Sequence, residues 1–185
     1  MKGREIKRPK PVQKKATDLG KRPKVLFVDD DHLIHRYTYD VAREVGVKHR
    51  HVYSVAKART AIAKRFRAIR KLQEIKRKQL LKSKSPKQKA ILINQLEILQ
   101  KMRKKPFDLI VSDVNMPAGF PVGVYFASGL KKKYPKQKVL MHSDDIESLD
   151  YLSNKYKIPY VSKMNFNAEE NLRNEIKKMI QAEKK

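Results

Sequence analysis

The sequence predicts an α/β protein, a doubly wound sheet of five parallel strands with helices on both faces. Three observations lead to this prediction. Short runs of almost purely apolar residues recur along the chain, as expected of strands buried on both faces of a parallel sheet. Each run ends in a polar residue, and segments with apolar residues at helical spacing lie between the runs. With 185 residues, 40% of them hydrophobic, the chain can bury one sizeable core with an appendage.

The elements can be placed in order along the chain. Residues 31–45 carry apolar side chains at helical spacing, and Asp31 at their start is a suitable N-cap. The last helix is predicted from about Ala168 to Gln181. The predicted strands are, in chain order, Val25–Val28, His51–Val55, Phe107–Ser112, Lys138–Ser143 and Pro159–Lys163.

The second and third strands are separated by more chain than one ordinary helix needs. A helical pattern runs from Ala56 to Leu80 and resumes from Ile91 to Met102. Ser-Lys-Ser-Pro at residues 83–86 breaks the pattern. The two apolar stripes predict an antiparallel helical hairpin, which we place at residues 64–105.

The formal charge of +26 is unevenly distributed. Residues 1–24 carry a net +8 and residues 64–105 a net +14, which leaves only +4 for the remainder. We therefore expect a basic, disordered tail at residues 1–23 and a core domain over residues 24–182, with the basic hairpin inserted in that domain.

Composition excludes several classes of protein. No stretch approaches the ~18 apolar residues of a membrane span, and the charged N-terminus lacks the apolar region of a secretory signal. Cysteine is absent, which rules out disulfides and thiolate metal sites and is consistent with a cytoplasmic protein.

Polar residues follow four of the predicted strands, namely Asp29–Asp31, Asp113, Ser143 and Lys163. Ligands of open parallel sheets bind beyond the carboxyl ends of the strands. Clustered carboxylates repel one another, and Mg²⁺ with its preference for oxygen ligands would relieve that repulsion. Ser143 and Lys163 are suited to bind a phosphoryl group, so Asp113 is a candidate nucleophile. A lone aspartate at a strand end is more often a helix cap or turn residue, but four strands in register favour a site.

At these positions the sequence resembles the receiver domain of two-component response regulators, of the chemotaxis-regulator type. The matching motifs, in the family's order, are V-D-D-D at 28–31, S-D-V-N-M-P at 112–117, M-H-S-D-D at 141–145 and Y-V-S-K at 160–163. The resemblance covers about residues 23–182 apart from the hairpin. It implies a flavodoxin-like sheet of strand order 2-1-3-4-5.

The resemblance also implies a phosphorylation site. In the family, the aspartate that corresponds to Asp113 accepts a phosphoryl group from a histidine kinase, a phosphotransfer protein or a small phosphodonor. Such a domain is not an enzyme acting on other substrates, but it catalyses its own phosphorylation and dephosphorylation. The matches to Asp30, Asp113 and the backbone carbonyl of Asn115 hold Mg²⁺, and the match to Asp29 assists.

The resemblance further implies a conformational switch. The matches to Ser143 and Lys163 contact the phosphoryl group, and the matches to Ser143 and Tyr160 move on activation, although Tyr160 is equally well explained as a core residue. The sequence departs from the family in three ways. Met164 stands where a proline is usual, the loop after Pro117 is about two residues longer, and the hairpin adds some forty residues.

The basic residues of the hairpin have two interpretations. They could form a solvated face that keeps a long amphipathic helix soluble. A net +14 in about forty residues also repels itself unless an acidic surface is near, which favours a partner: an acidic protein, nucleic acid or anionic lipid. Among these we favour an acidic protein assembly, because no motif that reads a DNA groove is visible. The candidate partner-binding residues are Arg67, Arg70, Lys71, Arg77 and Lys78.

We therefore expect a stand-alone receiver that signals by phosphorylation-dependent docking to a downstream protein, since only four residues follow the last helix. One alternative is a scaffold that is not phosphorylated and binds an acidic protein assembly or nucleic acid through its tail and hairpin. Another is a phosphatase of a related magnesium-aspartate class. Asn115 disfavours the phosphatase, because that class usually needs a second catalytic aspartate at this position.

Overall fold

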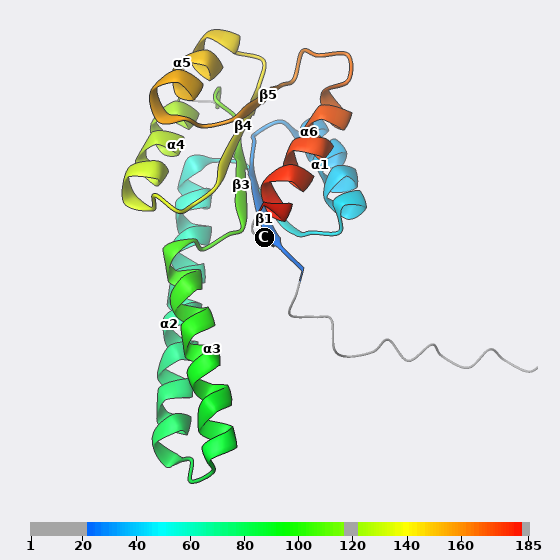
Figure 1. Ribbon diagram of the computed structural model, residues 1–185. Helices are drawn as coiled ribbons and strands as arrows, with labels where there is room; N and C mark the ends of the chain where they lie inside the picture. The colour runs from blue at the N-terminus through cyan, green and yellow to red at the C-terminus, as the bar shows by residue number, and fades with distance from the viewer. Residues whose placement is uncertain (1–21, 117–121, 183–185) are drawn as a thin grey trace, which may run out of the picture.

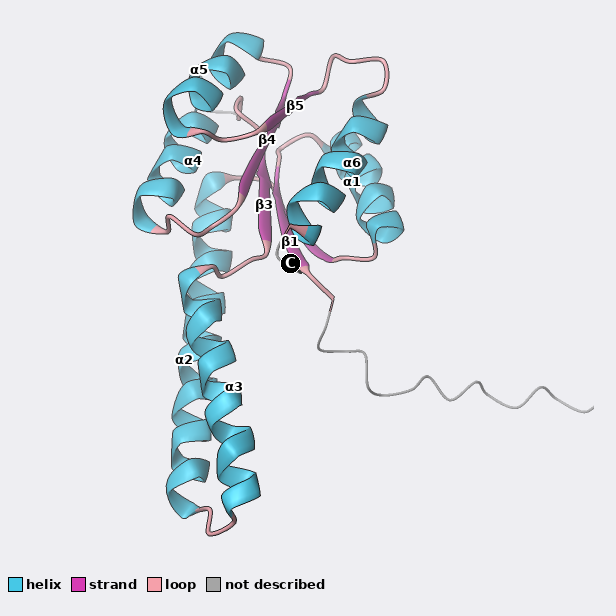
Figure 2. Ribbon diagram, in the orientation of Figure 1, coloured by secondary structure: helices cyan, strands magenta, loops and turns pink. Residues whose placement is uncertain are grey.

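A computed structural model describes residues 22–116 and 122–182 (Figure 1). Its centre is a five-stranded sheet of order β2-β1-β3-β4-β5, in which every neighbouring pair of strands is parallel (Figure 2). The strands are β1 (Lys24–Val28), β2 (Lys48–Val52), β3 (Leu109–Ser112), β4 (Val139–Ser143) and β5 (Tyr160–Ser162). The predicted fold class and strand order are thereby confirmed.

Helices cover both faces of the sheet. Helices α1 and α6 lie on one face, and α4, α5 and the first half of α2 lie on the other (Figure 1). The helices are α1 (His32–Val45), α2 (Val55–Lys82), α3 (Pro86–Lys104), α4 (Val122–Lys133), α5 (Ile146–Tyr156) and α6 (Ala168–Gln181). The sequence correctly predicted the bounds of α6, whereas it did not delimit α4 and α5.

Each strand feeds two cores, because successive side chains of a strand point to opposite faces. From β1, Val25 and Phe27 pack in the core beneath α1 and α6, while Leu26 and Val28 pack in the core beneath α2, α4 and α5. All four side chains are buried. The rigid double core fixes the carboxyl ends of the strands relative to one another.

The second strand lies three residues earlier than predicted, at Lys48–Val52 rather than His51–Val55. It is an edge strand, so only one of its sides is paired. Because it consists mainly of basic residues and histidines, it has no apolar run by which the sequence could indicate it. Ser54, which the prediction placed in the strand, is the N-cap of α2, and its hydroxyl accepts a hydrogen bond from the backbone N–H of Lys57.

The hairpin is formed by the second half of α2 and by α3, which pack antiparallel and project away from the sheet (Figure 1). Ser85 caps α3 and Pro86 opens it, as expected of a helix N-terminus. The predicted start at residue 64 marks no boundary in the structure, because α2 is continuous from Val55 to Lys82. The hairpin is therefore an extension of a helix that also covers the sheet.

The packing surface between α2 and α3 is narrower than the two apolar stripes predicted. Ile69 and Leu92 are buried in it. Four residues of the predicted stripes are instead 41–50% exposed, namely Leu72, Ile75, Ile91 and Ile98.

Candidate functional site

Backbone hydrogen bonds bring the carboxyl ends of the strands together at one rim of the sheet. The N–H of Asp29 donates to the carbonyl of Val52 (3.1 Å), and the N–H of Asp113 donates to that of Val28 (2.8 Å). The N–H of Lys163 donates to the carbonyl of Ser143 (2.8 Å). The residues that follow β1, β3 and β5 are thus tied to the neighbouring strand.

Lys163 joins two aspartates from different strands. Its Nζ lies 2.8 Å from Oδ2 of Asp29 and 2.8 Å from Oδ2 of Asp113. Asp29 and Asp113 are each only 6% exposed. The other carboxylate oxygen of Asp113 accepts hydrogen bonds from the N–H groups of Val114 (2.6 Å) and Asn115 (3.3 Å). These contacts fix the Asp113 carboxylate in one orientation.

Three carboxylates converge at this rim. Oxygens of Asp29, Asp30 and Asp113 all lie within 4.8 Å of one another. Together with the ammonium of Lys163 they carry a formal charge of −2. The donor set fits Mg²⁺, because all three donors are carboxylate oxygens, which this ion prefers. The net formal charge of −2, with Lys163 included, balances the charge of a divalent ion.

Burial and charge oppose each other within this cluster. Burial raises the pKa of Asp29 to about 6, because desolvation outweighs the stabilising charge and hydrogen bond of Lys163. Burial alone would lower the pKa of Lys163, but the charges and hydrogen bonds of Asp113 and Asp29 outweigh it and raise the pKa. Lys163 and Asp29 thus stabilise each other's charged forms against the cost of burial.

The remaining predicted site residues lie around this cluster. Ser143 is fully buried, and its Oγ accepts a hydrogen bond from the N–H of Asp145 (3.4 Å). Asn115 is exposed beside Asp113. Tyr160 is 36% exposed and donates its hydroxyl to Oδ1 of Asp150 (2.8 Å). The alternative that Tyr160 is a core residue is wrong, because its ring lies at the surface.

Gly123 is a site residue that the sequence analysis missed. A Cβ at this position would lie 1.9 Å from the carbonyl oxygen of Asp113, and the N–H of Gly123 donates to the carbonyl of Val114 (3.0 Å). Only glycine lets the start of α4 approach the backbone of the candidate nucleophile this closely. A glycine within an apolar helical pattern was the available signal. The longer loop noted after Pro117 falls largely within residues 117–121, which lie outside the described residues.

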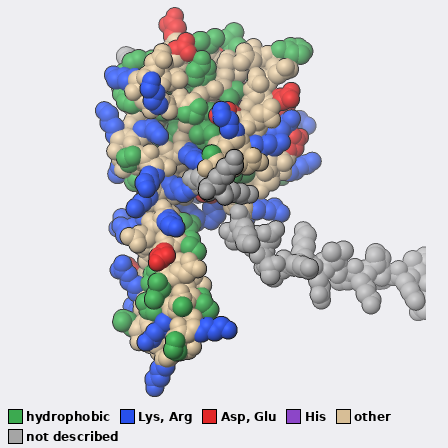
Figure 3. Space-filling view, viewed as in Figure 1, with side chains coloured by type: hydrophobic (Ala, Val, Ile, Leu, Met, Phe, Trp, Pro, Cys, Tyr) green, Lys and Arg blue, Asp and Glu red, His purple; other side chains and the backbone are tan. Residues whose placement is uncertain are grey.

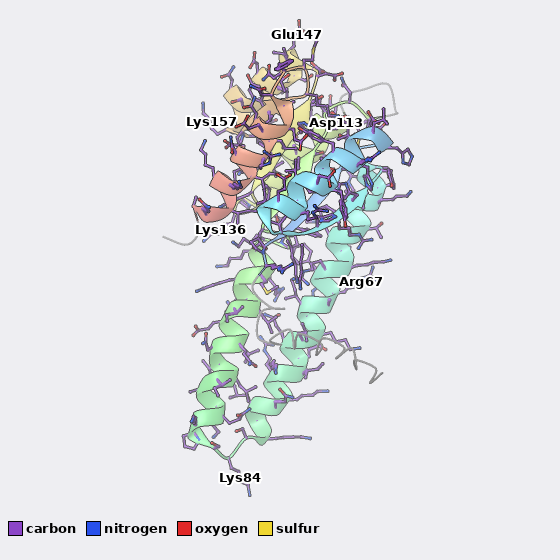
Figure 4. All side chains as sticks on the ribbon, turned by 90° about the vertical axis from the view of Figure 1, so that its right-hand side faces the viewer. Arg67, Lys84, Asp113, Lys136, Glu147 and Lys157 are labelled. Carbon is purple, nitrogen blue, oxygen red and sulfur yellow. The ribbon has the colours of Figure 1, made fainter. Side chains whose placement is uncertain are left out.

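The candidate partner-binding residues lie on α2, away from the acidic rim. Arg67, Arg70, Lys71, Arg77 and Lys78 are all exposed. Figure 4 shows Arg67 on the helix below the sheet-containing part of the molecule, where Asp113 lies, and Lys84 at the far tip of the hairpin. The structure thus separates the two predicted sites. The basic tail predicted at residues 1–23 lies almost wholly outside the described residues.

Several solved structures with the same fold are receiver domains. The signal receiver domain of an HD domain-containing protein from Pseudomonas fluorescens Pf-5 has a TM-score of 0.54 at 15% identity, with 91% of this chain and 93% of that chain covered. A response regulator receiver domain protein from Clostridium thermocellum has a TM-score of 0.53 at 16% identity, with coverage of 88% and 97%. Response regulator protein TrrA from Thermotoga maritima, in complex with Mg(2+)-BeF, has a TM-score of 0.51 at 19% identity, with coverage of 85% and 98%.

The chain therefore has the fold of a response regulator receiver domain. No family model and no curated protein sequence matches it. Within residues 22–116 and 122–182, no helix is long and apolar enough to cross a membrane.

Proposed function

We propose that this protein is a phosphorylation-controlled receiver in which Asp113 accepts a phosphoryl group with the help of Mg²⁺. The observation that carries the proposal is the position of the Lys163 ammonium, 2.8 Å from carboxylate oxygens of both Asp29 and Asp113. A cation in this position can pair with a phosphoryl oxygen as soon as one is attached to Asp113. The resemblance of the motifs and the receiver fold support the same assignment.

In the proposed reaction a carboxylate oxygen of Asp113 attacks the phosphorus of the donor. The bond from phosphorus to the leaving group breaks, the leaving group keeps the electron pair, and an acyl phosphate forms on Asp113. Hydrolysis restores the carboxylate: water attacks phosphorus and loses a proton, the bond from phosphorus to the Asp113 oxygen breaks with its electron pair staying on the carboxylate, and inorganic phosphate leaves. The donor is a histidine kinase, a phosphotransfer protein or a small phosphodonor.

The site residues divide the remaining work. Asp29, Asp30, Asp113 and the backbone carbonyl of Asn115 hold Mg²⁺, which when bound neutralises charge on the carboxylates and on the transferred phosphoryl group. Lys163 pairs with a phosphoryl oxygen. The N–H groups of Val114 and Asn115, which donate to one oxygen of Asp113, hold the carboxylate in place during attack.

Output in this proposal is a change of surface that a downstream protein recognises. The hydroxyl of Ser143 moves to the phosphoryl group, and Tyr160 leaves its hydrogen bond to Asp150 and turns inward. Docking of the partner then depends on phosphorylation, as expected of a switch whose two states differ in affinity for the partner.

Intact mass spectrometry tests this function. The purified protein is incubated with acetyl phosphate and Mg²⁺, with excess EDTA in a parallel sample, and compared with Asp113→Asn. We expect a gain of one phosphate that requires Mg²⁺ and is absent from the variant. No gain in the folded wild-type protein, or an equal gain in Asp113→Asn, would contradict the proposal.

A second candidate function is a scaffold that binds an acidic protein assembly or nucleic acid without being phosphorylated. The observation that favours it is the row of exposed cations on α2, including Arg67, Arg70 and Arg77. Within the described parts of the chain, none of these three forms an ion pair with an acidic side chain. If this function is the correct one, capture of the partner is the same for wild type and Asp113→Asn in the presence of acetyl phosphate.

A further inference from the structure

A groove separates α2 from α4 on the face of the molecule opposite α1 and α6. Its volume is about 670 Å³. The apolar side chains at its base include Ile62, Phe66 and Leu130, and the ring of Phe66 contacts that of Tyr134, with the ring centroids 5.0 Å apart. Ile62 and Leu130 are only 5% and 6% exposed, so the base of the groove is continuous with the core.

Cations surround this apolar base. Arg59, Arg67 and Arg70 line the groove from α2, and Lys133 lines it from α4, with Nζ 5.6 Å from the ring centroid of Tyr134. Among the residues that the structure describes, none of those lining the groove is acidic. Figure 3 shows Lys and Arg side chains gathered where the hairpin leaves the rest of the molecule. A ligand that fits this groove therefore has an apolar face toward the base of the groove and negative charges toward the edges of the groove.

The lining residues are spaced as on the sides of two helices. On α2 they recur from Arg59 to Arg70, which spans about 16 Å at 1.5 Å per residue, or three helical turns. On α4 they recur from Tyr125 to Lys133, and Tyr134 directly follows the helix. Gly129, in the middle of the α4 wall, has no atom within 4 Å of the position of a Cβ, so the groove is open there. This shape accepts one further helix rather than an extended strand, which would need a free sheet edge.

We propose that the groove between α2 and α4 binds an amphipathic acidic helix of a partner protein. Apolar residues of that helix, one turn apart, fill the space above Phe66 and Gly129, and its carboxylates pair with Arg59, Arg67, Arg70 and Lys133. The charge of the groove selects the partner, because a neutral or basic helix would leave the four cations desolvated without compensation. The site does not require Asp113 to be phosphorylated, so it stands or falls independently of the function proposed above.

The test uses the full chain and a fluorescent peptide of about four helical turns, with Leu at positions i, i+4, i+7 and i+11 and mostly Glu elsewhere. A scrambled peptide has the same composition and charge but no apolar stripe. Binding is measured by fluorescence anisotropy. Gly129→Leu fills the groove, and because the glycine is helical and faces open space this variant is expected to fold. The double variant Arg67→Glu/Arg70→Glu reverses the charge of one edge.

A matched control has the same charge change on the same helix outside the groove, Lys76→Glu/Lys82→Glu. We expect the designed peptide to bind at least about tenfold more tightly than the scrambled one, a difference of about 1.4 kcal/mol. Gly129→Leu and Arg67→Glu/Arg70→Glu should each weaken binding by about tenfold or more, and the control should weaken it less than about threefold.

Four results would overturn the proposal. Equal binding of the two peptides would mean that charge alone is recognised. Equal losses in Arg67→Glu/Arg70→Glu and in the control would assign binding to the whole basic helix. Unchanged binding in Gly129→Leu, with circular dichroism like that of wild type, would show that the groove is not the site. A short DNA duplex that displaces the peptide and is itself unaffected by Gly129→Leu would point to phosphate recognition along α2 instead.

Discussion

The acidic rim of the sheet and the basic hairpin handle charge in opposite ways. At the rim, three carboxylates converge on a single ammonium, and Asp29 and Asp113 are almost fully buried. On the hairpin the charges are cationic almost throughout and are exposed. Charge at the rim is compensated in part by a lysine of the protein itself, whereas charge on the hairpin is left for solvent or a partner.

This difference indicates what each region is built to do. Burying a charge costs free energy unless a partner is held in good geometry, so the rim must be rigid and its residues are fixed by neighbouring strands. An exposed row of like charges needs no rigid surroundings and acts at longer range on an oppositely charged surface. The functions proposed above follow this difference: small ions and a phosphoryl group at the rim, and a macromolecular partner at the hairpin.

The largest expected effect is on phosphorylation of Asp113, and it should differ between substitutions of two adjacent acids, Asp30 and Asp31. Asp30→Ala should abolish phosphorylation of Asp113 while the protein remains folded, because Asp30 is a proposed Mg²⁺ ligand that packs in neither core. Asp31→Ala is the matched control: its carboxylate caps α1 by accepting from the N–H of Leu33 (2.7 Å). It should cost about 1 kcal/mol of stability and leave phosphorylation intact. Normal phosphorylation of Asp30→Ala by intact mass would remove Asp30 from the site.

The next effect concerns the internal compensation at the rim. Without Mg²⁺, Lys163→Met should lower the free energy of unfolding by roughly 3–5 kcal/mol, because two buried carboxylates lose their cation. Asp29 already has a raised pKa of about 6, and removing Lys163 raises that pKa further. A carboxyl group with a raised folded pKa contributes stability below its unfolded pKa and loses it as pH rises through the folded pKa.

Lys163→Met should therefore be more destabilised relative to wild type at about pH 8 than at about pH 5. Added Mg²⁺ should stabilise the variant more than it stabilises wild type, since the variant has one more uncompensated negative charge. Urea unfolding at both pH values, with and without Mg²⁺, measures these differences. Equal stabilisation of both proteins by Mg²⁺ would indicate that the ion does not bind beside Lys163.

A smaller effect, on stability, should differ between two glycines of α4. Gly123 lies beside the rim, and Gly129 lines the groove beside α2. Gly123→Ala should destabilise the protein by about 1–3 kcal/mol and slow phosphorylation, because the new methyl group would collide with the carbonyl of Asp113. Gly129→Ala should stabilise it by about 0.5–1 kcal/mol, because the methyl group meets open space in a helix. Thermal unfolding of both variants measures the contrast, and a stabilising Gly123→Ala would mean that α4 does not press on the site.

The smallest expected effect is that of removing most of the hairpin. Between residues 67 and 106 no side chain belongs to either hydrophobic core, and the ends of the excursion are held together where Nε of Arg65 donates to the carbonyl of Pro106 (3.4 Å). Replacing residues 67–103 by a short Gly/Ser bridge should leave the fold and the phosphorylation of Asp113 unchanged, at a small cost in loop closure. Circular dichroism and intact mass check this, and an unfolded deletion variant would show that the hairpin supports the core.

Strong local patterns made much of this structure predictable. The apolar runs of β1, β3 and β4, each with a polar residue at its end or directly after it, predicted that Asp29, Asp113 and Ser143 lie at one rim. Asp31 was predicted as a cap from residue type alone, and it is one. The strand at the edge was misplaced, because a strand with few buried side chains has no apolar run to find.

Features that depend on close packing between distant segments were not predictable. The contact of Gly123 with Asp113 arises where α4 meets β3, and no spacing in the sequence encodes the distance. Leu72 and Ile75 follow the helical period but are largely exposed, since α3 covers only one side of α2. The groove above Phe66 forms only where α4 lies beside α2, so the sequence alone could not predict that these apolar and basic residues line one groove.

The central claim is that the rim accepts a phosphoryl group on one residue, Asp113, and its most direct test is to locate that group chemically. Borohydride reduces an aspartyl acyl phosphate to homoserine, so the protein is treated with acetyl phosphate and Mg²⁺, reduced with borohydride, digested and sequenced by mass spectrometry. The account predicts homoserine at position 113 and aspartate at positions 29, 30 and 31, with no conversion when EDTA is present. Homoserine at any of those other positions, or none in the folded protein, would contradict it.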